Sequence, residues 1–362
     1  MNANLPEISR PSEEGRSWRA FHFFYHGPLA LVLLHFVRPA IGRLLADGLI
    51  DSFFFIRYPL GGPHVRLRIL PNTNRAEEAS ERLLVDAAGF LAQRPSISPI
   101  DPEAIRRQNL AILATAPEEN DDAAYPDNTF MAVPFIPEKE RYGGVPLLAS
   151  SLDFFAISSA RSLSFVAAHE DDPWPRQLSA ISRLLALQAW GLAHDAEDLM
   201  ILLASRAGFT AAEDPLLRRG DEAFDRQSDT YCALLRRELA SVLGGGEAPW
   251  FGEAARRLAH ELRGADALLR RSIGLSQIHM TANRLGLKIQ EEVYLGRILW
   301  RAARELAAAD PGFWRELCDT LRPGKNGGRV RNLFPAAFQE AFPGSLRNVL
   351  AREEQGLAAE LS

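Results

Sequence analysis

The sequence predicts an α+β protein in which a small, mainly antiparallel sheet from the N-terminal third packs against a large helical remainder. Alternating apolar and polar residues occur only in short segments before Pro137, whereas apolar residues recur at spacings of three and four from Pro146 onward. The composition is globular, because 47% of the 362 residues are hydrophobic and 24% are charged. We expect residues 1–17 to be a flexible N-terminus and residues 18–362 to form a single domain.

The N-terminal third alternates strand and helix patterns. Trp18 to Phe23 alternates and predicts a strand, and Gly27-Pro28 then opens a helix that ends near Asp47. The Gly-Pro-rich stretch 59–63 separates two strands of a hairpin. The remaining expected elements here are strands at Ser52 to Tyr58, His64 to Leu70 and Thr129 to Phe135, and helices over 74–94 and 101–113.

The rest of the chain is predicted to be helical. Helical spacing covers 146–168, 174–207, 218–243 and 250–272, and Gly244 to Gly246 and Pro323 to Gly328 predict flexible breaks. The longest apolar run, Pro28 to Val37, is about half of the roughly 20 residues that a bilayer span needs, so we expect no membrane span. The N-terminus lacks the apolar core of a signal peptide, and Cys232 and Cys318 have no metal-binding spacing, which together favour a reducing cytoplasm.

Charge and missing motifs exclude several functions. The net charge of −5 argues against a protein that binds nucleic acid directly. Nearly all positive charge lies on arginine, because the chain has only Lys139, Lys288 and Lys325 as lysines. The sequence contains no GxGxxG, HExxH or GxSxG motif, so we expect any catalysis to run without a cofactor or metal.

The first candidate cluster is the strand from His64 to Leu70. Its period-two geometry places His64, Arg66 and Arg68 on one face and apolar residues on the other. Arginine forks on a fixed face can bind carboxylates and stabilise developing negative charge. A half-exposed strand with solvated arginines gives the same pattern.

The second candidate cluster runs from Pro137 to Gly144. Glu138 and Arg141 lie three residues apart, and Gly143-Gly144 permits close backbone approach. Taken alone, the cluster is equally typical of a surface ion pair.

The third candidate cluster is a helix from Gln277 that ends at Gly286. Helical spacing aligns a polar stripe that contains Ser272, Ser276, His279 and Asn283. His279 is either a general acid or base or a structural histidine, since histidine is the side chain that titrates near neutrality unaided.

Together these clusters resemble the family of lantibiotic dehydratase C-terminal domains and stand-alone thiopeptide biosynthesis proteins. The matching segments follow the family's order over about residues 18 to 305: Trp18, Phe54-Phe55-Ile56-Arg57-Tyr58, His64-Val65-Arg66-Leu67-Arg68, Glu138-Lys139-Glu140-Arg141-Tyr142-Gly143-Gly144 and His279-Met280-Thr281-Ala282-Asn283-Arg284-Leu285-Gly286. Ser158-Ser159 departs from the family, which carries Asp-Ser at that place.

The resemblance implies one of two reactions. In glutamate elimination, a glutamylated Ser or Thr of a ribosomal precursor peptide becomes dehydroalanine or dehydrobutyrine. In the alternative, a formal [4+2] cycloaddition joins two dehydroalanines into a pyridine and releases the leader peptide. Elimination is favoured because the family's elimination residues have counterparts here in the catalytic set Arg66, Arg68, Glu138, Arg141 and His279, much of which pyridine-forming members tend to have lost. The residues expected to bind the substrate are Arg57, His64, Tyr142, Asn283 and Arg284.

The resemblance also implies partners. The expected substrate is the leader and core of a precursor peptide, and 362 residues leave no room for the large glutamyl-transfer domain of full dehydratases. We therefore expect a separate glutamyl-tRNA-dependent glutamylation protein to act first. A catalytically silent peptide-binding subunit is the remaining interpretation.

Overall fold

The predicted α+β class is confirmed by the computed structural model, which describes residues 17–114, 123–243 and 250–321. The chain divides into two compact units, with the boundary between Pro137 and Glu138. The first unit holds a four-stranded sheet and the second is helical. The single domain expected for residues 18–362 contains both units and stays a prediction.

The sheet is antiparallel throughout, with the strand order β2-β3-β1-β4. The strands are β1 (Arg19–Phe24), β2 (Ile50–Tyr58), β3 (His64–Pro71) and β4 (Thr129–Val133). The expected hairpin of β2 and β3 is confirmed, and Gly61 and Gly62 adopt positive φ angles of 82° and 112° in its turn, where a side chain would be strained. β1 lies inside the sheet because it pairs with both β3 and β4.

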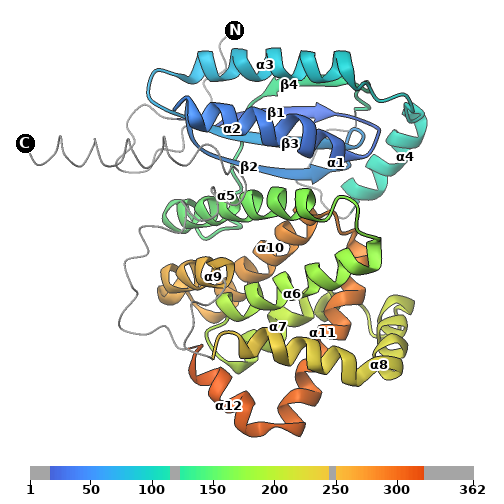
Figure 1. Ribbon diagram of the computed structural model, residues 1–362, viewed down its shortest axis with the longest axis vertical. Helices are drawn as coiled ribbons and strands as arrows, with labels where there is room; N and C mark the ends of the chain where they lie inside the picture. The colour runs from blue at the N-terminus through green and yellow to red at the C-terminus, as the bar shows by residue number, and fades with distance from the viewer. Residues whose placement is uncertain (1–16, 115–122, 244–249, 322–362) are drawn as a thin grey trace, which may run out of the picture. The chain divides into compact units, whose positions relative to one another are not determined.

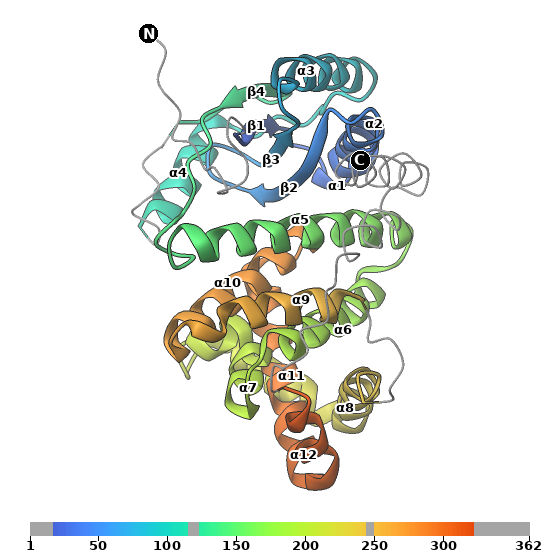
Figure 2. The same cartoon turned by 90° about the vertical axis from the view of Figure 1, so that its left-hand side faces the viewer.

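Helices cover one face of this sheet (Figures 1 and 2). They are α1 (Leu29–Val32), a π-helical turn (Leu33–Val37), α2 (Arg38–Ala46) and α3 (Ala76–Gln93). Phe23 of β1 joins the layers, since its ring centroid lies 5.0 Å from that of Phe36 in the π-helical turn and 5.7 Å from that of Phe90 in α3. The sheet residues of this face, among them Phe21, Val65 and Leu67, are fully buried. The unit is completed by α4 (Pro102–Leu113).

The segment 29–46 is the only one in the described residues that is long and apolar enough to cross a membrane. Its buried side chains, including Val32, Phe36 and Ile41, pack into the core under the sheet. Length and composition do not distinguish a membrane span from a buried core helix. The contact of Phe36 with Phe23 of the sheet identifies this segment as a core helix.

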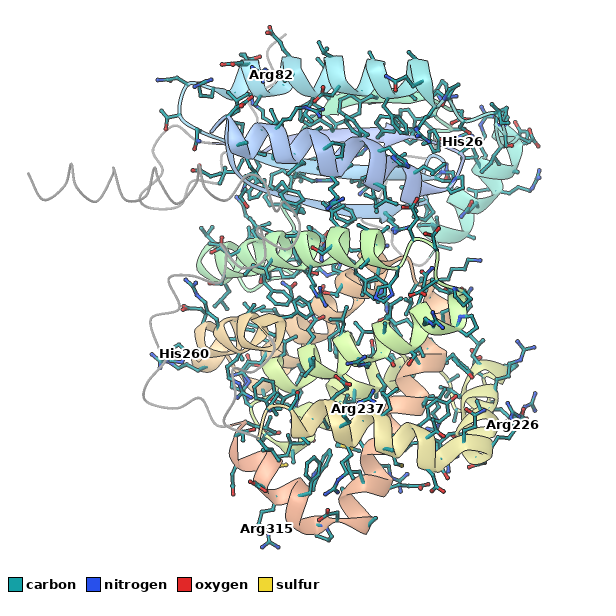
Figure 3. The ribbon with its side chains drawn as sticks, viewed as in Figure 1. His26, Arg82, Arg226, Arg237, His260 and Arg315 are labelled. Atoms are coloured by element: carbon teal, nitrogen blue, oxygen red, sulfur yellow. The ribbon has the colours of Figure 1, made fainter. Side chains whose placement is uncertain are left out.

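The second unit is built from helices alone in its described part. They are α5 (Val145–Ala168), α6 (Trp174–Leu192), α7 (Ala196–Ala204), α8 (Pro215–Ala240), α9 (Trp250–Glu261), α10 (Ala267–Leu285), α11 (Ile289–Ala309) and α12 (Pro311–Asp319), with short 3₁₀ turns at Ser205–Phe209 and Leu262–Gly264. Exposed arginines such as Arg226 on α8 and Arg315 on α12 point away from this unit (Figure 3).

Two predicted helices were too long. The pattern over 174–207 is broken between α6 and α7, where the Asp195 carboxylate accepts a hydrogen bond from the backbone N–H of Asp198. The pattern over 250–272 is broken before α10, where Asp266 caps the backbone N–H of Leu269. Aspartate at each of these positions caps a new helix. The break was not predicted because the apolar spacing continues on both sides of it. The expected flexible N-terminus at 1–16 and the glycine-rich breaks at 244–246 and 323–328 lie outside the described residues.

Candidate functional site

The second face of the sheet carries the first predicted cluster. The register pairs His22 of β1 with Arg66 of β3, and Ala20 with Arg68. Paired residues of antiparallel strands share a face, so His22, His64, Arg66 and Arg68 all lie on the face opposite Phe23. Arg66 and Arg68 are two residues apart on one strand, which separates their Cα atoms by about 7 Å.

His64 and Arg66 form a hydrogen-bonded group. The His64 Nδ1–H donates to the Gly62 carbonyl at 2.9 Å, which leaves Nε2 to accept from the Arg66 Nε–H at 3.2 Å. The Arg66 guanidinium also stacks 3.6 Å from the centroid of the Tyr58 ring. These contacts fix the fork of Arg66, while its half-buried side chain keeps access to solvent.

The imidazoles on this face are uncharged. Burial, with the nearby His64 and arginines, lowers the pKa of His22 to about 2. Burial also lowers the pKa of His64 to about 3, against the opposing effect of its hydrogen bond to Gly62. Arg66 and Arg68 therefore carry the positive charge of this group of four at neutral pH.

Arg57 does not lie with this group. It pairs with Val65 in the register and therefore points to the helix-covered face. Burial lowers the pKa of its guanidinium to about 10, which still leaves it charged at neutral pH. Its predicted role beside His64 in substrate binding would need a different orientation.

The second cluster forms the turn that leads into α5. Arg141 and Glu138 make the expected ion pair at 2.8 Å, with side chains 41% and 59% exposed. Gly143 and Gly144 have positive φ angles of 74° and 86°, and the Gly144 N–H donates to the Lys139 carbonyl. The turn therefore presents a charged fork to solvent, where the ion pair itself contributes little to stability.

Tyr142 and Arg284 lie inside the helical unit. The Tyr142 hydroxyl is 2.9 Å from the Ser276 hydroxyl, and burial raises the pKa of this tyrosine. Arg284 is 0% exposed, stacks 4.7 Å from the centroid of the Phe155 ring and donates to the Ser158 hydroxyl at 3.3 Å. These contacts hold α10 to α5. Both side chains are buried, and their predicted role in substrate binding stays a prediction.

His279 points to a different side of α10. Arg284 follows it by five positions, which places the two side chains about 140° apart around the helix. Its Nδ1–H donates to the Glu292 carboxylate of α11 at 2.7 Å. Asn283, one turn further along α10, is half-buried. The predicted polar stripe is therefore divided between Ser276, which faces Tyr142, and His279, which faces α11.

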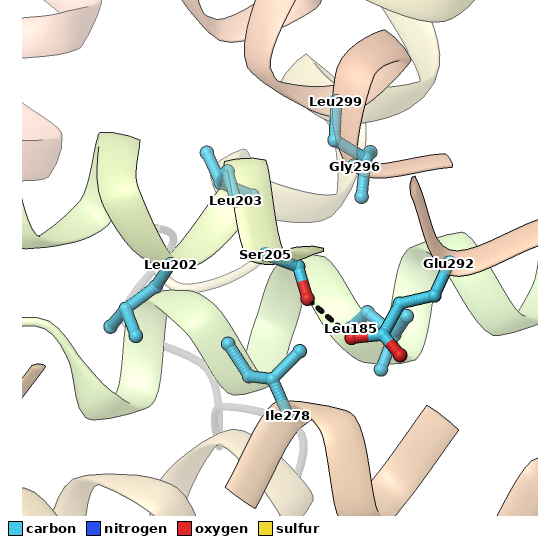
Figure 4. Close-up of a pocket in the computed structure, with 8 residues that line it drawn as sticks. All are labelled: Leu185, Leu202, Leu203, Ser205, Ile278, Glu292, Gly296 and Leu299. Carbon is cyan, nitrogen blue, oxygen red and sulfur yellow. Dashed lines mark hydrogen bonds between the residues drawn. The ribbon is translucent and has the colours of Figure 1, made fainter. Parts of the chain in front are cut away.

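The Glu292 carboxylate has a second partner. The Ser205 hydroxyl donates to it at 2.6 Å, and Ser205 adopts a positive φ of 45° that is unusual for this residue type (Figure 4). Glu292 is 2% exposed and lines a small cavity with Ser205, among leucines of α6 and α7, Ile278, Gly296 and Leu299. Because a carboxylate only accepts, this contact places the His279 proton on Nδ1 and leaves the Nε2 lone pair uninvolved in it.

The described residues include no group of three or more His, Cys, Asp or Glu side chains that could hold a metal ion. Cys232 and Cys318 are both free thiols. The expected absence of a cofactor stays a prediction.

Sequence comparison identifies the family. The profile described as "Lantibiotic biosynthesis dehydratase C-term" matches residues 18–303. The chain belongs to this family. Membership places the chain in the biosynthesis of ribosomally made, modified peptides, among enzymes that alter such peptides. A search of curated protein sequences finds no significant match.

Solved structures share the fold of this family member. The pyridine synthase TbtD from thiomuracin biosynthesis aligns with a TM-score of 0.66 and 22% identity, over 81% of this chain and 99% of TbtD. TsrL aligns with a TM-score of 0.54 and 14% identity, over 83% of this chain and 99% of TsrL. The tRNA-dependent lantibiotic dehydratase MibB from Microbispora sp. 107891 aligns with a TM-score of 0.55 and 20% identity, over 83% of this chain and 29% of MibB.

Sequence reasoning missed His22 and Glu292. The alternation of β1 already puts His22 on the face opposite Phe21 and Phe23, but only the pairing of β1 with β3 brings it beside Arg66. Glu292 follows His279 by thirteen residues in a separate helix. The sequence signal for Glu292 was an acidic residue among the apolar residues that α11 buries.

Proposed function

We propose that this protein eliminates glutamate from glutamylated Ser or Thr residues of a ribosomal precursor peptide. A base removes the Cα proton, the electron pair forms the Cα=Cβ double bond, and the Cβ–O bond breaks. The products are a dehydroalanine or dehydrobutyrine residue and a glutamate whose carboxylate takes the bonding electrons. The leaving group is thus an anion.

One observation carries the proposal: Arg66 and Arg68 share a sheet face on which His22 and His64 are neutral. The charge of this group is positive and is held on guanidinium forks, which bind carboxylates through paired hydrogen bonds. Fixed cations of this kind stabilise a developing carboxylate or enolate oxygen without reorganisation. We assign the same role, stabilising a developing carboxylate or enolate oxygen, to the exposed guanidinium of Arg141.

In this proposal His279 is the base that removes the Cα proton. Its contact with Glu292 keeps the Nε2 lone pair available, which is the arrangement of a general base supported by a carboxylate. Glu138 positions Arg141 through their ion pair. Departure of glutamate then needs neither ATP nor tRNA nor metal.

The test is direct. Purified protein is incubated with a chemically prepared glutamyl-Ser peptide, and mass spectrometry follows the loss of glutamate. We expect the dehydro product to form without ATP, tRNA or metal. A peptide with an acetyl ester at the same serine is the matched control, because it lacks the glutamyl group. An unchanged glutamyl ester would contradict the proposal.

Formal [4+2] cycloaddition is the second candidate. It is favoured by the alignment with TbtD, a pyridine synthase, which covers 99% of that protein. In that reaction the sheet face that carries Arg66 and Arg68, called the arginine face below, would bind an acidic leader peptide. Conversion of a linear peptide that bears two dehydroalanines into a pyridine, with release of the leader, would select this candidate if the glutamyl ester stays intact.

We further propose that the precursor peptide reaches this protein after a separate glutamyl-tRNA-dependent protein has glutamylated it. This proposal is supported by the alignment with 29% of MibB, a tRNA-dependent lantibiotic dehydratase. The test is a reaction in which a separate glutamylation protein is either added or left out. We expect the dehydro product from the unmodified precursor peptide only when that protein is present. The proposed compartment is the cytoplasm.

A further inference from the structure

His22 differs from the other imidazole on the arginine face. Both ring nitrogens of His64 are occupied, Nδ1 by the Gly62 carbonyl and Nε2 by Arg66. His22 makes ring contacts with His64 at 4.8 Å and with Phe24 at 6.0 Å, measured between centroids, but no hydrogen bond to any residue in the described part of the chain. Its side chain is half-buried, in contrast to that of His64, which is 1% exposed.

The position of His22 is fixed by the sheet. Its register partner is Arg66, and the pairing of Ala20 with Arg68 places the second arginine one pair further along. β1 is held on both sides by β3 and β4, which restrains the backbone of His22. The ring packing against His64 restrains the imidazole.

We propose that His22 is a catalytic hydrogen-bond donor that binds the departing glutamate carboxylate together with Arg66 and Arg68. This inference rests on the proposed elimination reaction. The imidazole N–H donates to a carboxylate oxygen as negative charge collects there, and no proton changes hands at this residue. The site thus recognises a carboxylate with two guanidiniums and one neutral N–H donor.

The neutral state of His22 excludes two other roles. The groups that face it are His64, Arg66 and Arg68, and each of them disfavours a charged imidazole. An imidazole that remains uncharged at working pH is a weak base, so it does not remove the Cα proton. It also adds no third positive charge, so the product glutamate is released more readily than from three cations. A neutral ring can still polarise an oxygen as a donor.

The experiment compares His22→Phe, which removes the donor and keeps an aromatic ring, with His22→Asn, which keeps an N–H donor. His35→Asn is the control, because His35 is an exposed histidine of the same unit. Single-turnover elimination of the glutamyl-Ser peptide and calorimetric binding of free L-glutamate are both measured. We expect His22→Phe to lower each by roughly tenfold or more, and His22→Asn to stay within about threefold of wild type, as expected for one hydrogen bond to a charged group.

The outcomes separate this inference from the proposed function. If wild type binds glutamate but leaves the ester intact, the elimination proposal fails and the binding comparison still decides the role of His22. If wild type eliminates glutamate and His22→Phe matches it in rate and binding, the inference is wrong. It is also wrong if wild type shows no glutamate binding, or if His22→Phe loses melting temperature while its turnover per folded molecule stays normal. A ¹⁵N-detected titration of His22 that shows a charged ring near neutral pH would overturn it as well.

Discussion

Arg66 illustrates how a strand can hold a guanidinium in a fixed orientation. Its planar guanidinium stacks on Tyr58 through its face and donates to His64 through Nε, and neither of these two contacts uses the terminal N–H groups. A lysine in this position could supply charge but could not stack and donate at the same time. The geometry of the fork is therefore set before any substrate binds.

Substitution of single arginines tests this use of geometry. We expect Arg68→Lys and Arg141→Lys to slow elimination by on the order of 10² each, because a point charge cannot reproduce a bidentate contact with the leaving carboxylate. Arg82→Lys is the control, since Arg82 makes an exposed ion pair with Asp47 at 2.6 Å. The measurement is the single-turnover rate of glutamate loss. Near-wild-type turnover by folded Arg68→Lys would mean that the buried Arg68 guanidinium does not hold the leaving carboxylate.

At the level of elements, the junction of α10 and α11 carries the proton-transfer assignment. We expect His279→Ala and Glu292→Gln each to stay folded by circular dichroism and to accumulate glutamylated peptide, with rates lower by roughly 10². The amide that Glu292→Gln introduces would donate to Nδ1 and so stabilise the tautomer that lacks a basic Nε2. Because the two residues act as a unit, the double variant should be no slower than His279→Ala.

Glu305→Gln provides the control for this pair, since Glu305 lies on the same helix as Glu292 and its side chain is 51% exposed. Additive losses in the double variant would separate Glu292 from His279. Loss of melting temperature with normal turnover per folded molecule would identify His279 as a packing residue, and Glu138 would then be the next candidate for the base.

The same elements show what local sequence can and cannot predict. The C-terminus of α10 was predictable because Gly286 adopts the left-handed conformation, with φ of 97°, that ends helices. The starts of α7 and α10 were missed because Asp195 and Asp266 interrupt apolar spacing that continues on both sides. Local propensity and capping act within a few residues. The type of each element, strand or helix, was therefore predictable from the sequence, but some helix boundaries were not.

Over the whole molecule, the candidate residues depended on contacts that join distant segments. The face of Arg66 and Arg68 followed from the period of one strand, but the exclusion of Arg57 from that face and the inclusion of His22 required the register of three strands. The burial of Arg284 likewise depends on its contacts with Phe155 and Ser158 in α5. Sequence alone therefore identified charged groups without showing which of them reach solvent.

The buried neutral histidines also make the stability of the molecule depend on acidity. His64 is 1% exposed and its pKa is lowered to about 3, whereas in the unfolded chain it binds a proton below its ordinary pKa of 6.5. Between these values the unfolded state binds one more proton than the folded state, so the free energy of unfolding falls as pH falls. Each pH unit in this window costs about 1.4 kcal/mol for one such histidine.

We therefore expect acid to destabilise wild type more than a variant in which this titration is removed. Between about pH 7 and about pH 5, His64→Asn should lose roughly 2 kcal/mol less than wild type in urea unfolding, whatever its stability at neutral pH. His35→Asn should retain the wild-type dependence, because His35 is exposed and its removal leaves the buried ring in place. All other titrating groups cancel in the comparison. Equal losses in wild type and His64→Asn would mean that His64 gains its proton in the folded protein, and the arginine face would then carry a third positive charge as the pH falls through that range.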